Sequence, residues 1–145
     1  MRAPADLNIL IIDDDCDIRE RFTNFLARRG YNVFTAEDGH DGLQKLKNND
    51  IDIIYCDISM PKMDGLEFLD HIREINLKAE IIMVTGTSSV EKCMQCFEKN
   101  VFAYLLKPLK LDDILENLDK AVKHLEEKKT MVKNALLAAK AERSA

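Results

Sequence analysis

Five short hydrophobic runs alternate with five segments of helical periodicity, and this alternation favours one class of fold. The runs are Asn8–Ile12, Asn32–Thr35, Ile51–Cys56, Glu80–Val84 and Ala103–Leu106. Most of them are continuously hydrophobic and rich in β-branched residues, which is typical of strands covered on both faces. The helical segments are Asp17–Arg29, Asp41–Asn48, Leu66–Ile75, Val90–Lys99 and a last one that begins at Leu111. Short connections predict right-handed crossovers, a parallel sheet and a three-layer α/β architecture.

Residues at the helix boundaries support this division. Asp64 with Glu67, and Ser88 with Glu91, have the spacing of a capping box at the start of the third and fourth helices. Gly30 is placed to end the first helix, because glycine is favoured just past a helix C-terminus. A single domain fits 145 residues, and no repeat, low-complexity segment or Pro/Gly-rich linker divides the chain.

Composition and charge argue against several classes of function. The chain has 26 acidic and 21 basic residues and a net charge of −5, whereas a nucleic-acid surface needs a basic patch to contact phosphates. No hydrophobic run approaches the roughly 20 residues of a membrane span. The segment from Met1 to Asp6 lacks the hydrophobic stretch of a secretory signal. We therefore expect a cytoplasmic protein that binds neither membranes nor nucleic acid directly.

The four cysteines are Cys16, Cys56, Cys93 and Cys96, and their spacing is not that of a disulfide-rich secreted domain. The last two form a C-x-x-C pair inside a predicted helix, without a second ligand pair or a nearby histidine. Reduced, packed thiols are the expectation, and a zinc or redox role is the alternative.

Acidic, hydroxyl and lysine side chains follow the carboxyl ends of four predicted strands, the edge where functional groups gather in open parallel sheets. They are Asp13-Asp14-Asp15 after the first strand, Asp57 after the third, Thr85-Gly86 after the fourth and Lys107-Pro108 after the fifth. Singly, Asp15 and Thr85 have the ordinary role of helix caps. Asp57 alone suits a turn, and Lys107 alone suits the solvated surface. Their occurrence at successive strand ends favours a shared site.

The combination of three acids, a hydroxyl and a lysine has a coherent chemistry. Grouped carboxylates repel one another unless a cation neutralises them, and carboxylate and water oxygens suit Mg²⁺. A carboxylate is also a nucleophile that accepts a phosphoryl group as an acyl phosphate. A metal ion and a lysine neutralise the transferring oxygens, and a hydroxyl hydrogen-bonds the phosphoryl group. The set predicts Mg²⁺-dependent transfer of a phosphoryl group to a carboxylate.

Four stretches carry a resemblance to a known family. They are Ile9–Asp15 (I-L-I-I-D-D-D), Cys56–Gly65 (C-D-I-S-M-P-K-M-D-G), Val84–Gly86 (V-T-G) and Tyr104–Pro108 (Y-L-L-K-P). Over residues 7–126 the chain resembles the receiver domain of two-component response regulators, and the D-x-x-M-P-x-x-D-G pattern is persuasive by itself. The resemblance implies a flavodoxin-like (βα)5 doubly wound sheet with strand order 2-1-3-4-5, which the alternation alone does not establish.

The resemblance also implies roles for the acidic residues. Asp57 corresponds to the phosphoacceptor, whose donor is a histidine kinase or a phosphotransfer protein. Asp14 and Asp57 correspond to direct Mg²⁺ ligands, together with the backbone carbonyl of Ser59, whereas Asp13 acts largely through bound water. Mn²⁺ is expected to be able to replace Mg²⁺. Such a module catalyses its own phosphorylation and dephosphorylation and is not a classical enzyme.

Three further residues correspond to the switch of the family. Lys107 contacts the phosphoryl group, Thr85 is the switch hydroxyl, and Tyr104 is the aromatic residue that turns inward when Thr85 moves. Without the motif, Tyr104 has the simpler explanation of a half-buried strand residue. The output face comprises the fourth helix, the fifth strand and the fifth helix, and it acts on a downstream protein target or a tethered output domain. The Lys107–Pro108 bond is usually cis in this family.

The chain departs from the family at a few positions. Cys16 stands where a proline or small polar residue is often found after the acidic cluster. Ser59 and Thr87 are small and neutral at positions through which the family tunes the lifetime of the phosphoryl group. This pair does not give a lifetime, and neither departure affects the core assignment.

Two other functions account for parts of the pattern. A haloacid-dehalogenase-type phosphatase places its nucleophile after the first strand, where Asp13 would serve. Its distal acidic pair and cap domain have no room in this chain, and the pattern from Met60-Pro61 to Asp64-Gly65 stays unexplained. A pseudo-receiver that binds partners without phosphorylation requires the loss of an active-site residue, and none is lost.

Helical character continues beyond residue 126, where a receiver normally ends. Hydrophobic positions follow a 4,3 spacing through Leu111, Leu115, Leu118, Val122, Leu125, Val132, Leu136 and Ala139, with Lys129 at one position of the repeat. We therefore expect a receiver domain over residues 1–126 and a C-terminal extension over residues 127–145. The extension is either a solvated helical linker or a short coiled coil that forms a weak homodimer. The chain is then a stand-alone regulator or a piece of a larger regulator or hybrid kinase.

Overall fold

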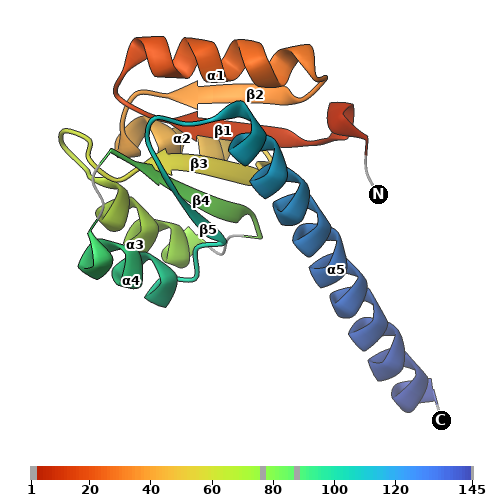
Figure 1. The fold of residues 1–145 in the computed structure, drawn as a ribbon. Coiled ribbons are helices and arrows are strands. Elements are labelled where there is room, and N and C mark those ends of the chain that lie inside the picture. The colour runs from red at the N-terminus through yellow and green to blue at the C-terminus, as the bar shows by residue number, and fades with distance from the viewer. Residues whose placement is uncertain (1–2, 76–77, 87–88, 145) are drawn as a thin grey trace.

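The computed structural model describes residues 3–75, 78–86 and 89–144 of the chain. The described strands form a parallel sheet in the order β2-β1-β3-β4-β5, and helices cover both of its faces (Figure 1). The strands are β1 (Asn8–Ile12), β2 (Asn32–Ala36), β3 (Ile53–Asp57), β4 (Glu80–Thr85) and β5 (Ala103–Leu106). The helices are α1 (Cys16–Arg28), α2 (Gly39–Asn48), α3 (Gly65–Ile75), α4 (Val90–Glu98) and α5 (Leu111–Ser144). The predicted fold class and strand order are confirmed.

Two predicted boundaries are wrong by two residues, and one element was not predicted. Helix α2 begins at Gly39 rather than Asp41, because the Asp38 carboxylate caps it and accepts a hydrogen bond from the backbone N–H of Asp41 at 2.8 Å. Strand β3 begins at Ile53 rather than at residue 51. Just before the strand, the carboxylate of Asp52 accepts a hydrogen bond from the backbone N–H of Asn8 at 2.9 Å. A short 3-10 turn, η1 (Pro4–Asp6), precedes β1.

The predicted caps of α1 and α3 are confirmed. Asp15 is the N-cap of α1, and its carboxylate accepts from the backbone N–H groups of Asp17 and Ile18. Gly30 has φ +92° and follows the end of α1. Its N–H donates to the carbonyl of Ala27, and the next N–H donates to the carbonyl of Leu26, the two bonds of a Schellman motif. Asp64 accepts from the N–H of Glu67 at 2.9 Å at the start of α3.

The predicted cap of α4 is one residue too early. Ser89 is the N-cap, and its hydroxyl accepts from the backbone N–H of Lys92 at 3.3 Å. The predicted cap, Ser88, lies outside the described residues, as does Thr87. Adjacent serines offer the same side chain at two registers, so the spacing to Glu91 alone did not select the correct one.

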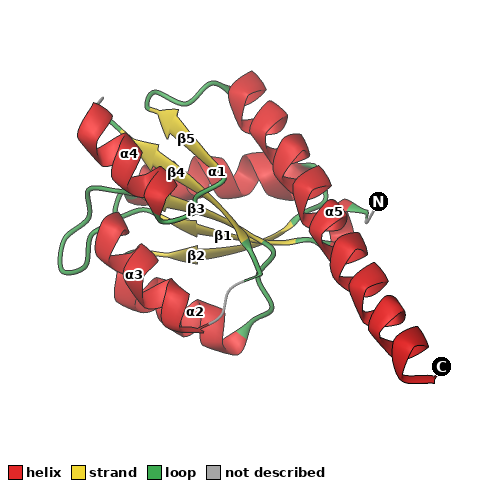
Figure 2. Ribbon diagram, turned by 90° about the horizontal axis from the view of Figure 1, so that it is seen from below, coloured by secondary structure: helices red, strands yellow, loops and turns green. Residues whose placement is uncertain are grey.

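Two hydrophobic layers hold the helices on the sheet, and Figure 2 shows the ribbon of the helices around the strands. One layer joins Leu10, Ile54 and Met83 of the strands to Phe68 of α3 and Cys96 of α4. The other layer joins strand residues to α1 and α5, and it includes Ile9, Ile11, Tyr55, Phe22 and Leu118. Alternate strand residues enter opposite layers, because successive side chains of a strand point to opposite faces. Burial on both faces explains why the strands are continuously hydrophobic.

Helix α5 packs on the sheet with its first half and extends away from the body with its second half (Figure 1). Its buried residues are Ile114, Leu118, Ala121, Val122 and Leu125. Leu118, Val122 and Leu125 of the 4,3 repeat are thus core residues, whereas its first member, Leu111, is 56% exposed. Packing on a sheet selects a wider stripe of period 3.6, which brings in Ile114 and Ala121. The helical extension is confirmed, and the domain boundary at residue 126 stays a prediction.

A buried acid fixes the direction in which α5 leaves the body. Glu80 begins β4 and is 5% exposed. Its carboxylate accepts a hydrogen bond from Nδ1 of His124 at 2.8 Å and pairs with the ammonium group of Lys128. The ring of His124 also packs against Phe102, with centroids 5.4 Å apart. These contacts tie two successive turns of α5 to the amino end of the sheet.

Membrane insertion of a helix finds no support in the described ranges. No helix within residues 3–75, 78–86 and 89–144 is both long enough and hydrophobic enough to span a bilayer.

Gly65 permits the close approach of α3 to the end of β3, and its substitution tests this packing. A Cβ at this position would lie 2.5 Å from the carbonyl oxygen of Asp57 and 2.8 Å from Cα of Ile58. We predict that Gly65→Ala lowers the free energy of unfolding by about 1–3 kcal/mol, because backbone atoms must move apart. Urea denaturation followed by circular dichroism measures this loss.

Gly86→Ala is the matched control for that substitution. Nothing lies within 4 Å of a Cβ built on Gly86, so its free energy of unfolding should change by less than about 1 kcal/mol. Equal effects of the two substitutions would contradict the packing argument.

Candidate functional site

Three carboxylates meet at the carboxyl edge of the sheet. Asp57 is the last residue of β3, and Asp13 and Asp14 follow β1. Strands β1 and β3 are neighbours with Ile12 opposite Cys56, so the register places the acids beside one another. Oxygen atoms of the three carboxylates all lie within 4.8 Å of one another. Asp13 and Asp57 are 3% and 5% exposed, whereas Asp14 is exposed to solvent.

Lys107, which follows β5 at the same edge, bridges two of these carboxylates. Its Nζ donates to Oδ2 of Asp13 at 2.9 Å and to Oδ2 of Asp57 at 3.2 Å. The backbone N–H of Lys107 donates to the carbonyl of Thr85 at 2.7 Å, which fixes the start of the loop after β5. The Lys107–Pro108 peptide bond is cis, as the resemblance implied. The structure thus brings together the four charged residues that the sequence predicted for one site.

The electrostatics of the site follow from burial and crowding. Burial raises the pKa of Asp57, and the Asp13 carboxylate adds to this, while Lys107 and the N–H of Ser59 act in the opposite direction. Burial by itself would lower the pKa of Lys107, but the hydrogen bonds and charges of Asp13 and Asp57 together raise it. Lys107 is therefore a permanent cation at neutral pH, held against two acids.

Backbone and side-chain contacts orient the acidic loop after β1. The carboxylate of Asp13 accepts from the backbone N–H of Asp15 at 2.9 Å, an Asx-type turn. Arg19 on α1 donates from Nη1 to the carbonyl of Asp13 at 2.7 Å. This arginine was not predicted from the sequence, because a single basic residue on a helix carries no signal of its own. Its position about one turn inside α1 places it beside the loop that this helix follows.

The loop after β3 is held in a similar way. Oδ1 of Asp57 accepts from the backbone N–H of Ser59 at 3.2 Å. The N–H of Gly65 donates to the carbonyl of Ile58 at 2.8 Å. Lys62 takes up a positive φ of 68° within this loop, and its ammonium lies 3.8 Å from the Asp38 carboxylate. The Asp57 side chain is therefore fixed by its own loop as well as by Lys107.

Thr85 and Tyr104 lie on the face of the sheet that packs against α2, α3 and α4. Thr85 ends β4 and is fully buried. Tyr104 of β5 is half-buried, pairs in register with Met83 and packs against the same hydrophobic layer as Met83. Burial raises the pKa of the Tyr104 hydroxyl, which stays neutral at physiological pH. The two predicted switch residues thus lie on one face, near the strand end that carries Asp57.

The charges of this site fit a divalent cation. Three carboxylates and one ammonium give the site a formal charge of −2, which one divalent ion would neutralise. The available ligands are all oxygen atoms, which suits a hard cation such as Mg²⁺. No other group of three such ligands occurs among the described residues.

The cysteines do not form a second centre of this kind within the described residues. All four are free, and Cys93 and Cys96 lie in α4. Burial raises the pKa of the Cys96 thiol to about 11, so it is protonated at neutral pH. Its sulfur packs in the hydrophobic layer under α4. These observations support a packed thiol at Cys96 over a zinc or redox pair with Cys93, whereas Cys16 is exposed and the expectation of a packed thiol is wrong there.

A doubly wound sheet with an acidic triad, a lysine and a hydroxyl at its carboxyl edge defines a phosphoacceptor-type signalling module. The sequence matches the response regulator receiver domain family over residues 9–119. The chain therefore belongs to the response regulator receiver domain family. This membership favours Asp57 chemistry over the phosphatase alternative with Asp13 as nucleophile.

Curated relatives are longer proteins with a similar segment. The chain is 36% identical over 121 residues to the transcriptional regulatory protein ZraR of Salmonella typhimurium, covering 83% of this chain and 27% of ZraR. It is 37% identical over 113 residues to the sensor histidine kinase RcsC of Escherichia coli, covering 78% of this chain and 12% of RcsC. The chain thus matches about a quarter or less of the length of these relatives.

Solved structures agree with the fold over nearly their whole length. A CheY-like receiver domain of Methanospirillum hungatei has a TM-score of 0.81 at 31% identity, covering 84% of this chain and 98% of that one. The response regulator TrrA of Thermotoga maritima, solved in complex with Mg²⁺-BeF, has a TM-score of 0.71 at 31% identity. That alignment covers 79% of this chain and 98% of TrrA.

The raised pKa of Asp57 predicts how pH affects stability when metal is absent. A carboxyl whose folded-state pKa is raised stabilises the fold below its ordinary pKa, and this contribution is lost as the pH rises through the folded-state value. We therefore expect Asp57→Asn to raise the melting temperature at pH 7 in EDTA. The gain should shrink as the pH falls and vanish where Asp57 is protonated in both states. Lys107 stays charged throughout this range.

Thermal unfolding of wild type and Asp57→Asn between pH 3 and pH 8 measures this difference. Glu20→Gln is the control, because Glu20 is an exposed acid on α1. Its substitution should leave the melting temperature nearly unchanged at every pH. A lower melting temperature of Asp57→Asn at pH 7 would contradict the assignment of repulsion to the site.

Proposed function

We propose that Asp57 is the phosphoacceptor of this receiver domain. The observation that carries the proposal is the position of its carboxylate, buried at the end of β3 and 3.2 Å from Nζ of Lys107. A lysine at this distance neutralises an equatorial phosphoryl oxygen once the group is transferred. Burial removes competing water, and the bond from Ser59 N–H holds the carboxylate in one orientation.

The proposed reaction is phosphoryl transfer from a phosphohistidine. A carboxylate oxygen of Asp57 attacks phosphorus, the N–P bond breaks, and the imidazole nitrogen of the donor keeps the electron pair and takes a proton. An acyl phosphate forms on Asp57. The donor is a histidine kinase or a phosphotransfer protein. The domain also promotes the hydrolysis of its own acyl phosphate, and in this sense it acts on itself alone.

Asp14, Asp57 and the backbone carbonyl of Ser59 are the proposed direct Mg²⁺ ligands, with Asp13 acting through water. Bound there, the ion would neutralise charge on the transferring phosphoryl oxygens. Asp14 is the exposed member of the triad, and no hydrogen bond or ion pair to Lys107 occupies it in the described structure. Mn²⁺ also accepts carboxylate, carbonyl and water ligands, so we propose that it can replace Mg²⁺.

Phosphorylation acts on the face formed by α4, β5 and α5. Thr85 is the last residue of β4 and Lys107 follows β5, and both lie at the carboxyl edge of the sheet, where Asp57 ends β3. Movement of Thr85 toward a phosphoryl group on Asp57 frees space on the sheet face that Tyr104 shares. The phosphoryl group favours the active state through these differential contacts.

The proposed partners follow from this scheme. The donor kinase or phosphotransfer protein acts upstream, and a downstream protein target or a tethered output domain binds the switched face. The named relatives combine a similar segment with transcriptional regulation or kinase function, which supports an output of this kind. The apolar residues of the C-terminal extension support a weak homodimer at high concentration, opposed by the lysines among them.

Phosphorylation in vitro tests the identity of the acceptor. We predict that wild type incubated with phosphoramidate and Mg²⁺ gains the mass of one phosphoryl group, and that Asp57→Asn gains none. The amide cannot form the acyl phosphate, although its shape is preserved. Intact-protein mass spectrometry measures the adduct, and an equal yield on the variant would refute Asp57 as the acceptor.

The same assay addresses the metal. Asp14→Ala or EDTA should abolish most of the adduct, and Mn²⁺ should restore it to metal-free wild type. Asp112→Ala is the control, because Asp112 is an exposed acid at the start of α5. Its adduct should equal that of wild type.

The switch is tested by beryllofluoride, a mimic of the phosphoryl group. We predict that amide shifts of α4 and β5 on its addition become much smaller in Thr85→Ala and in Lys107→Ala than in wild type, because each variant lacks a contact that couples the site to Tyr104. Two-dimensional NMR measures these shifts. Thr130→Ala and Lys120→Ala are matched controls on the exposed surface of α5 and should behave as wild type. Undiminished shifts in both site variants would overturn the switch.

A further inference from the structure

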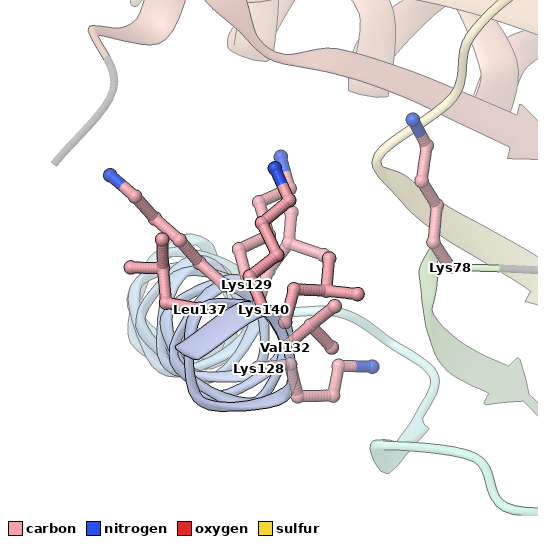
Figure 3. A pocket seen from close by; sticks show the side chains of 9 residues that line it. Lys78, Lys128, Lys129, Val132, Leu137 and Lys140 are labelled. Carbon is pink, nitrogen blue, oxygen red and sulfur yellow. The ribbon is translucent and has the colours of Figure 1, made fainter. Parts of the chain in front are cut away.

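A groove lies in the corner between the C-terminal extension and the base of the body (Figure 3). Its volume is about 580 Å³. Helix α5 forms one wall with Leu125, Val132, Leu136 and Leu137. Lys78, which precedes β4, stands across from the helix on the other side. This groove lies at the amino end of the sheet, opposite the edge that carries Asp57.

The hydrophobic residues of the groove continue the stripe by which α5 packs on the sheet. Leu125 is buried against the body, whereas Val132 and Leu136 are 60% and 61% exposed. From Leu125 to Leu136 the stripe extends over 11 residues, about 16 Å at the rise of an α-helix. Exposed hydrophobic side chains that continue a packed stripe form a surface suited to another amphipathic helix.

Lysines surround this hydrophobic stripe. Lys78, Lys128, Lys129, Lys133 and Lys140 all line the groove. Lys78 and Lys128 are engaged with Asp50 and Glu80. The other three lysines form no ion pair with any part of the chain that the structure describes. They are available to carboxylates of a partner.

The charge of the extension differs in sign from that of the rest of the chain. Residues 127–145 carry five basic and two acidic side chains, whereas residues 1–126 carry 16 basic and 24 acidic ones. The basic charge is thus concentrated beside the groove. Complementary charge at the rim of an interface favours the encounter with an acidic partner and disfavours a basic one.

A second copy of the chain fits this groove poorly. Pairing two extensions through the same stripe would place Lys129, Lys133 and Lys140 of one copy against the same lysines of the other. The extension offers only Glu127 and Glu142 to offset them. Like charges in a self-pairing helix destabilise the pair.

A membrane surface also fits poorly. The groove is a corner with Lys78 on one wall and α5 on the other, and a flat bilayer cannot contact both walls. The excess of acidic residues in 1–126 would also be repelled by anionic lipids. A convex, negatively charged helix meets both requirements.

The part of the groove nearest the body is anchored before any partner binds. Glu80 holds His124 and Lys128, so the turn of α5 that enters the groove is anchored to β4. Leu125 is 1% exposed and anchors the same turn from the hydrophobic side. A preformed site loses little conformational entropy on binding, which favours affinity.

We propose that this groove binds an acidic amphipathic helix of a partner protein. The apolar face of that helix packs on Val132, Leu136 and Leu137, and its flanking carboxylates pair with Lys129, Lys133 and Lys140. The groove is formed by the C-terminal part of α5 at the amino end of the sheet, away from the phosphoacceptor site, so the proposal does not rest on the proposed function.

An unbiased selection tests the chemistry of the partner. A displayed library of 20-residue amphipathic helices keeps leucine at the apolar positions and randomises the flanking positions among Glu, Lys, Gln and Ser. Selection on the immobilised full chain should enrich Glu at the flanks. Enrichment of Lys, or no preference among the four residues, would overturn the proposal.

Binding of a selected peptide, labelled with fluorescein, is then measured by anisotropy. The triple variant Lys129→Glu, Lys133→Glu, Lys140→Glu should bind it at least about tenfold more weakly, because three rim ion pairs become repulsive. Leu136→Ser should weaken binding by a similar factor, and raising the salt concentration should weaken binding to wild type. The control reverses three lysines elsewhere, Lys47→Glu, Lys120→Glu and Lys123→Glu, and should bind like wild type. Circular dichroism verifies that each variant is folded.

Two further measurements test the other possible occupants of the groove, a membrane surface and a second copy of the chain. Vesicles of phosphatidylserine and phosphatidylcholine should not bind the chain in a flotation assay. Analytical ultracentrifugation measures self-association at high micromolar concentration. The fraction of the chain in dimers should be smaller than the fraction that binds the peptide at the same concentration. Three outcomes would each refute the proposal. The first is that wild type and the groove triple variant bind the peptide with equal affinity. The others are that wild type binds the vesicles and the triple variant does not, or that a tight dimer excludes the peptide.

Discussion

The repulsion among Asp13, Asp14 and Asp57, and its partial relief by Lys107, is the interaction on which the rest of the structure depends. Two buried carboxylates whose oxygens lie within 4.8 Å of each other oppose folding. One lysine bound at 2.9 and 3.2 Å offsets part of this cost. The remainder is balanced by the two hydrophobic layers, which hold β1 and β3 side by side. The site therefore keeps an excess of negative charge that favours binding of a cation, because the scaffold prevents the carboxylates from moving apart.

Strand register and close backbone packing fix the positions of the charged groups in this site. Ile12 lies opposite Cys56, which fixes the relative heights of the acids that follow. Gly65 lets α3 begin directly against the carbonyl of Asp57 and Cα of Ile58. Lys107 reaches back from β5 because its own N–H is bound to the carbonyl of Thr85. A change in any of these contacts alters charge spacing in a region where the effective dielectric constant is low.

The sequence predicted the parts of this structure that depend on local pattern. Hydrophobic runs located all the strands, and the caps at Asp15 and Asp64 were found because their partners lie within three residues. Strand order came from the family resemblance, since alternation is compatible with other orders. The role of Glu80 was missed because its partners, His124 and Lys128, lie more than 40 residues away. Arg19 was missed for a different reason, since nothing in an isolated arginine indicates that it binds the carbonyl of Asp13.

Helix α5 connects the two ends of the molecule that carry charge of opposite sign. It begins at Leu111, close in sequence to Lys107 at the acidic site, and it continues without interruption to Ser144 beside the lysine-rich groove. Its backbone hydrogen bonds make it stiff, and Glu80 and Leu125 fix it near its middle. A change in the connection after β5 would reach the extension through this one helix, and it would have to move the contacts of Glu80 and Leu125. If phosphorylation changed the affinity of a partner for the groove, linkage would require the converse: that partner would change the phosphorylation equilibrium by the same factor.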